Sequence, residues 1–89
     1  MSIKGILPFP ALKNEEVAVL RIDTMTGHIL DEKYVLFMRN SNQKAFSIFS
    51  NRNEAIDFII NNEHHNVEFL ILDKNEHIIY PFEYIDRLN

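Results

Sequence analysis

Two adjacent histidines beside an acid are the side chains in this sequence that most suggest chemistry. Glu63, His64 and His65 follow one another directly, and the other two histidines are His28 and His77. A metal ion needs several such ligands around one point. Adjacent side chains, however, point apart in a strand and diverge by about 100° on a helix. Imidazoles also suit the negative end of a helix dipole. We therefore expect a solvated helix terminus here and no metal site.

Carboxylates and serines supply no better catalytic set. The pairs Glu15–Glu16 and Asp31–Glu32 are sequence neighbours, whereas acid–base catalysis needs two carboxyls in different environments of one cleft. Ser47 and Ser50 have no glycine nearby, unlike a nucleophile on a sharp turn. The absence of cysteine excludes disulfides and thiolate chemistry. We expect no catalytic residue, no cofactor and no enzyme, although a triad assembled only in space stays open.

Residues 33–53 are positively charged, although the chain as a whole is acidic. Their cations and aromatic residues are Lys33, Arg39, Lys44, Arg52, Tyr34, Phe37, Phe46 and Phe49, and they contain no acid. Interleaved cations and rings can stack and bind single-stranded nucleic acid. The same pattern is typical of a hairpin with its rings in the core and its cations in water. The net charge of −4 disfavours a phosphate-backbone partner.

The first half of the chain predicts an extended segment followed by three strands. Pro8 and Pro10 keep residues 1–14 out of helix and central strand. Strands are predicted at 16–23, 28–38 and 44–49, where β-branched and aromatic residues are enriched. Gly27 supplies the positive φ of the first turn. The polar residues 31–33 predict a bulge or break inside the second strand.

The second half predicts one helix between strands. Asn51 suits the N-cap of a helix over 52–62, with Glu54 in a variant capping box. Helical spacing predicts a buried face, with Phe58 at its margin, made of Ala55, Ile56, Ile59 and Ile60. Strands follow at 67–72 and 77–80, joined by a turn in which Asn75 can adopt a left-handed conformation. Residues 82–88 predict a short helical turn.

These elements predict an α+β fold. The expected architecture is a two-layer sandwich, with a mainly antiparallel sheet of about five strands in the order β-β-β-α-β-β and one helix packed on one face. A chain of 89 residues has room for one core, so residues 1–89 form a single domain. No apolar run approaches the roughly 20 residues of a membrane span, and no targeting signal is recognisable. A cytoplasmic protein is expected.

The predicted strands carry apolar residues on both sides, but the one predicted helix covers only one face of the sheet. The second face therefore needs another cover. The residues proposed for an interaction surface are Val17, Val19, Val35, Phe37, Leu70 and Leu72. An uncovered face would expose an apolar patch larger than monomers usually carry. We therefore expect a homodimer or a protein partner, unless the terminal segments 6–12 and 82–88 close the core unaided.

The function class that fits best is a small non-catalytic protein–protein interaction module. It would be of the kind represented by inhibitors and immunity proteins, which neutralise a partner. One alternative is a single-stranded nucleic-acid binder through the 33–53 hairpin, which would need exposed aromatic rings. Another is a small enzyme or ligand-binding domain, which would need a deep pocket lined by a histidine and a carboxylate.

Overall fold

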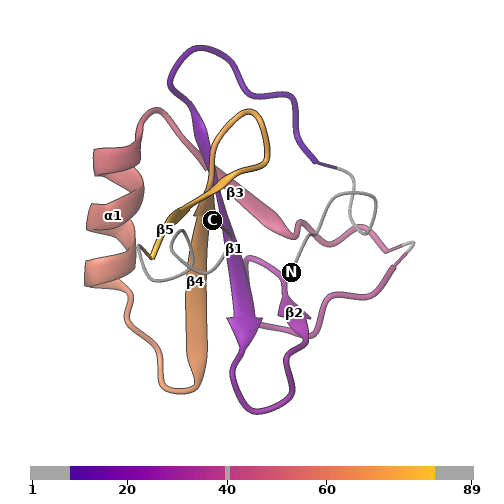
Figure 1. Cartoon of the computed structure of the whole chain (residues 1–89). Helices are drawn as coiled ribbons and strands as arrows, with labels where there is room; N and C mark the ends of the chain where they lie inside the picture. The colour runs from indigo at the N-terminus through magenta and orange to yellow at the C-terminus, as the bar shows by residue number, and fades with distance from the viewer. Residues whose placement is uncertain (1–8, 40, 82–89) are drawn as a thin grey trace.

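The computed structural model of the chain describes residues 9–39 and 41–81. They form a five-stranded antiparallel sheet and one helix, which confirms the predicted α+β class and element order (Figure 1). The elements are β1 (Val17–Asp23), β2 (Ile29–Leu30), β3 (Phe46–Phe49), α1 (Arg52–Asn61), β4 (Val67–Leu72) and β5 (Ile78–Tyr80).

Strand β1 lies at the centre of the sheet. Strand β4 pairs along one of its edges, and β5 pairs with β4. Strands β3 and β2 share the other edge, with β3 beside residues 17–20 and β2 beside residues 21–22. The two short strands therefore occupy one strand position, and the chain leaves the sheet between them at residues 31–45.

The second strand was predicted over 28–38, but it ends at Leu30. The reason is local, because Asp31 Oδ1 accepts hydrogen bonds from the backbone N–H groups of Lys33 and Val35, at 2.8 and 2.9 Å. Tyr34 adopts a left-handed conformation with φ 65°, and only Leu36 bridges back, to Leu30. The break predicted at the polar residues 31–33 is confirmed, and the strand predicted beyond it is wrong.

Helix α1 begins as predicted, at a side-chain cap. Asn51 Oδ1 accepts a hydrogen bond from Glu54 N at 2.9 Å, and Glu54 Oε2 accepts one from Ser50 N at 3.2 Å. The first bond satisfies a backbone donor that the first helical turn leaves without a partner, and the second ties the residue before the cap to the helix.

The buried face of α1 is centred differently from the prediction. Ala55 and Ile59 are buried and Ile56 is half-buried, but Ile60 is 59% exposed. Phe58 packs on the other side of Ala55 and Ile59, which shifts the centre of the face towards it. At about 100° per residue, Ile60 then points roughly 120° away from that centre. The prediction that Ile60 is buried is wrong for this reason.

The two strand-connecting turns depend on different residues. Gly27 has φ 77°, as predicted for the turn after β1. In the turn after β4, Asp73 Oδ1 accepts hydrogen bonds from Asn75 N and His77 N, both at 2.9 Å. The left-handed residue there is Glu76, with φ 63°, and not Asn75. Asp73 organises this turn, and the left-handed residue lies one position later than predicted.

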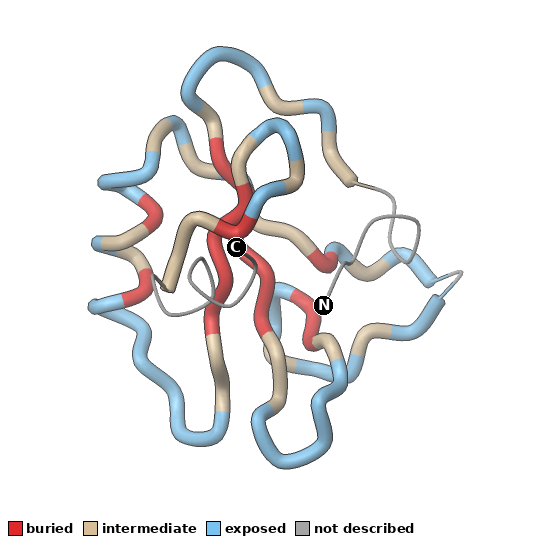
Figure 2. The backbone as a smooth tube through the Cα atoms, viewed as in Figure 1, coloured by how far each residue is buried: buried red, intermediate tan, exposed pale blue. Residues whose placement is uncertain are grey.

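Alternate residues of each strand point to opposite faces, and each face carries its own core. The buried residues of the core between the sheet and α1 are Val17, Val19, Ala55, Ile59, Phe69 and Ile71. Those on the opposite face are Leu20, Ala45, Leu70, Leu72 and Ile78. Figure 2 shows the buried positions concentrated on β1 and β4.

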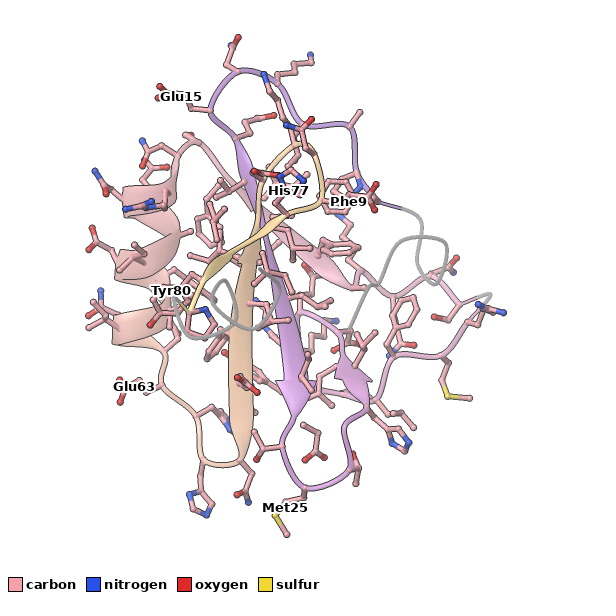
Figure 3. All side chains as sticks on the ribbon, in the orientation of Figure 1. Phe9, Glu15, Met25, Glu63, His77 and Tyr80 are labelled. Atoms are coloured by element: carbon pink, nitrogen blue, oxygen red, sulfur yellow. The ribbon has the colours of Figure 1, made fainter. Side chains whose placement is uncertain are left out.

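The second face of the sheet is covered within a single chain. Phe9 of the N-terminal segment, labelled in Figure 3, and Phe37 of residues 31–45 pack against its core. The Phe9 and Phe46 rings meet edge-on at 5.2 Å between centroids. The expectation of an uncovered second face is therefore wrong, because the chain folds back over it between β2 and β3. Phe9 belongs to the segment 6–12, which was named from sequence as a possible cover; residues 6–8 of that segment and the other possible cover, residues 82–88, lie outside the described residues.

Among residues 9–39 and 41–81, the structure contains no helix long and apolar enough to cross a membrane.

Candidate functional site

The segment that joins β2 to β3 is the candidate binding site, and we call residues 31–45 the 31–45 loop. Its described residues contain no helix, and its backbone meets β2 at the bridge from Leu36 to Leu30 and at the hydrogen bond that Phe37 N donates to Ile29 O at 2.9 Å. Loops of more than about 12–15 residues are uncommon in small domains and often carry function. In Figure 1 the loop extends to the right of the sheet, with α1 on the left.

Asp31 holds the first half of the loop. Its carboxylate is buried and accepts, besides the two backbone hydrogen bonds given above, one from Gln43 Nε2 to Oδ2 at 2.8 Å. The backbone hydrogen bond from Val35 is the largest cause that holds the pKa of Asp31 below its ordinary value of 3.8, against the opposing effect of burial. The hydrogen bonds from Gln43 and Lys33 and the charge of Lys33 act in the same direction. Asp31 is therefore an ionised, fully engaged anchor.

Gln43 links the two halves of the loop. Its Nε2 also donates to Leu36 O at 2.7 Å, while its Oε1 accepts from Met38 N and Ser41 Oγ, both at 2.8 Å. The backbone of Glu32 donates to Lys44 O at 3.1 Å, which closes the base of the loop. These contacts fix the backbone from inside the loop without a packed core of its own.

The fixed loop exposes large apolar side chains. Val35, Leu36 and Met38 are 55%, 44% and 57% exposed, whereas Phe37 between them packs into the core. Met25 is also exposed, but it lies apart at the tip of the β1–β2 turn (Figure 3). The loop therefore offers a preorganised apolar contact surface.

The residues proposed from sequence for an interaction surface do not come together. Val17 and Val19 are buried between the sheet and α1, and Leu70 and Leu72 are buried on the opposite face. The register explains the separation, because Val19 lies opposite Ile71 rather than Leu70. Phe37 is half-buried, so of this set only Val35 is exposed.

The histidine pair lies in the connection after α1. The His64 ring stacks on the Tyr34 ring at 4.6 Å between centroids, and His65 is exposed. A surface hollow of about 350 Å³, open to solvent, is lined by His64 together with Glu63 and Glu68. Within the described part of the chain, no group of three or more His, Cys, Asp or Glu residues is placed to hold a metal ion.

The aromatic residues of the 33–53 stretch face inwards. Phe37 and Phe46 pack against the core on one face of the sheet, and Tyr34 and Phe49 pack against the core on the other. All four are half-buried. Base stacking needs an accessible ring face, so this arrangement gives a nucleic-acid interface little support.

Sequence reasoning missed Arg21, which is 2% exposed. It lies on β1 on the same face as the buried Val17 and Val19, directly opposite Phe69 of β4. The available signal was its place in the alternation, since every second residue before it is apolar. A charged residue at an inward position is an unusual feature that needs a physical explanation.

Comparisons of the chain with protein-family models, with curated proteins and with solved structures gave no match. Function is therefore inferred from the residues and geometry of this chain.

Proposed function

We propose that the protein is a small non-catalytic protein-binding module, of the inhibitor or immunity type, that docks through the 31–45 loop. The observation that carries the proposal is the exposure of Val35, Leu36 and Met38 on a loop held by Asp31 and Gln43. A preorganised loop loses little conformational entropy on binding. Apolar anchors presented in this way are typical of interface hot spots.

The partner is either a second copy of this chain or a different protein, and we favour a different protein. Both faces of the sheet have a core within one chain, so a second copy is not needed to bury apolar strands. The cytoplasmic location expected from the sequence is part of this proposal.

Affinity capture from cells that express the protein tests the proposal, with two matched variants of the full chain as baits. Val35→Ser combined with Met38→Ser removes two exposed anchors, while Met25→Ser removes an equally exposed methionine outside the loop. We expect wild type and Met25→Ser to retain the same protein, and the double variant to bind it at least about tenfold more weakly, since lost anchors often cost more than about 1.4 kcal/mol.

Circular dichroism establishes that the three baits are folded alike. Retention of the same partner by all three baits, or by none, would contradict docking through this loop. Salt-sensitive binding of a labelled single-stranded oligonucleotide at micromolar concentration would instead favour the nucleic-acid alternative.

A further inference from the structure

Arg21 is a buried cation whose contacts join the sheet, α1 and the 31–45 loop. Its Cζ lies 5.4 Å from the ring centroids of both Tyr34, in the loop, and Phe58, in α1. Its Nη2 donates a hydrogen bond to Ser47 Oγ of β3 at 2.9 Å. The remaining two nitrogens, Nε and Nη1, are buried and have no hydrogen-bond partner. Among the described residues, no carboxylate forms an ion pair with Arg21.

Folding stability alone does not account for an arginine at this position. Burying an ionised group without a counter-charge is costly, and replacing buried charges by apolar residues of similar volume often stabilises a fold. The two ring contacts and the single hydrogen bond offset part of that cost. Two buried nitrogens without acceptors remain, so the arginine needs a further reason.

The 31–45 loop is fastened to both faces of the sheet. Tyr34 packs against the core on the side of α1, and Phe37 packs against the core on the opposite side. Val35 and Leu36 lie between them, and Leu36 bridges to Leu30 of β2, a strand at the edge of the sheet. The loop therefore passes around this edge between Tyr34 and Phe37, which leaves Val35 and Leu36 turned towards solvent.

Tyr34 keeps its place in an unfavourable backbone conformation. Its φ of 65° is uncommon for a residue with a bulky side chain, so the contacts of the ring have to offset the strain. The ring stacks on His64 at 4.6 Å and meets Phe69 edge-on at 6.4 Å between centroids. Arg21 adds a cation over the ring, and this attraction is stronger where the partners are removed from water.

We propose that Arg21 is a positioning residue of the docking surface, which holds Tyr34 on the α1 side of the sheet and thereby keeps Val35 and Leu36 turned outwards. An arginine suits this role because its planar guanidinium stays charged and packs on aromatic rings. Its cost in folding free energy is of the kind that binding sites commonly carry. The inference rests on the proposed docking function, but its first test needs no partner.

Amide hydrogen exchange of the folded full chain, followed by NMR, measures the order of the loop. Val35 N donates a hydrogen bond to Asp31 Oδ1, and Phe37 N donates one to the backbone of β2, both at 2.9 Å. Exchange of these two amides therefore reports on local opening of the loop. Asp73 N, which donates to His77 O at 3.0 Å in the β4–β5 turn, is the reporter outside the loop.

Arg21→Met fills a similar volume without charge. We expect it to speed the exchange of both loop amides at least about tenfold, because a desolvated cation–π contact is lost. Asp73 N should exchange no faster, and the Tm should not fall. Lys13→Met, which removes an exposed cation outside the loop, is the matched control and should leave all three amides unchanged.

Two results would overturn the assignment. Loop amides that exchange at the wild-type rate in Arg21→Met would show that the guanidinium does not hold the loop. A lowered Tm with faster exchange at Asp73 N as well, or a variant that does not fold, would make Arg21 a general structural residue.

A double-mutant cycle tests whether Arg21 acts on the loop through Tyr34. Tyr34→Leu removes the ring and is expected to speed exchange of the loop amides at least as much as Arg21→Met does. Adding Arg21→Met to Tyr34→Leu should speed exchange by no more than about twofold further, since the contact between the two residues is already lost. Effects that multiply in the combined variant would mean that Arg21 acts through another residue, which contradicts the assignment.

Affinity capture with Arg21→Met as bait separates this inference from the docking proposal. The variant keeps the exposed anchors Val35, Leu36 and Met38, and it is expected to bind the partner of wild type at least about fivefold more weakly, because a loosened loop must be ordered on binding. Equal binding by the two baits would mean that docking does not use this positioning. If wild type retains no protein, the docking function fails, whereas the exchange rates still decide whether Arg21 positions the loop.

Discussion

Asp31 and Arg21 are both buried and charged, and their surroundings differ sharply. Asp31 accepts hydrogen bonds from two backbone N–H groups and from the Gln43 amide. Arg21 makes one hydrogen bond and leaves two nitrogens without acceptors. A satisfied buried charge organises the chain around it, whereas an unsatisfied one costs free energy of folding.

Asp31→Asn tests the first of these statements. The substituted amide places an N–H group against either a backbone N–H or the Gln43 amide, and it removes the charge that strengthens the hydrogen bonds. We expect a loss of roughly 1–3 kcal/mol in the free energy of unfolding near neutral pH, measured by urea denaturation. Glu32→Gln, at the exposed neighbouring position, is the control and should change little.

The difference in free energy of unfolding between wild type and Asp31→Asn is expected to depend on pH. Because folding lowers the pKa of Asp31 below its ordinary value of 3.8, its stabilising contribution is present above that value. It is lost as the pH falls through the lower folded-state pKa. The difference between wild type and Asp31→Asn should therefore shrink in strong acid. A difference that stays constant down to about pH 2 would show that the charge of Asp31 does not support the loop.

At the scale of elements, α1 is held to the sheet by a narrow face. Ala55 and Ile59 are buried, and Phe58 meets Phe49 and Phe69 at 5.0 and 6.0 Å between centroids. The helix also shields Arg21 from solvent, since the Phe58 ring centroid lies 5.4 Å from Arg21 Cζ. Loss of packing at this face should therefore affect both stability and the Arg21 environment.

Ile59→Ala is expected to lower the free energy of unfolding by about 2–5 kcal/mol, from lost burial and a residual cavity. Ile60→Ala, one residue further along, is a matched control because that side chain is mostly exposed. It should change stability by no more than about 0.5 kcal/mol. Equal losses in the two variants, measured by chemical denaturation, would mean that the helix is rotated relative to the described packing.

At the scale of the whole molecule, the two-sided core decides the expected oligomeric state. The chain buries strand residues on both faces of the sheet. Among residues 9–39 and 41–81, the exposed large apolar residues lie mainly on the 31–45 loop and the adjoining β3, where Ile48 is 50% exposed. A patch limited to a loop and one edge strand is more typical of a binding site than of a missing layer.

Light scattering at micromolar concentration should accordingly give a monomer of 10.5 kDa. A dimer that Val35→Ser with Met38→Ser converts to a monomer would identify a second copy as the partner of the loop. A dimer that the double variant leaves intact would mean that another surface associates.

Local physical chemistry allowed the sequence alone to determine much of this protein. Hydrophobic spacing predicted the α+β class and the order of elements, because both depend on periodicity within short windows. Asn51 marked the start of α1, and Gly27 marked the first turn, because capping and positive φ are properties of a few neighbouring residues. The polar residues 31–33 likewise indicated where the second strand breaks.

Pairings between distant segments were decided only by the tertiary structure. The register that puts Val19 opposite Ile71 separates valines and leucines that the sequence had grouped, because a shift of one residue exchanges the faces of a strand. The placement of β2 and β3 on one edge of β1 sends the 31–45 loop outwards and brings Gln43 to Asp31. The same packing buries Arg21 between Tyr34 and Phe58. These residues are far apart in the chain, and no local propensity encodes their meeting.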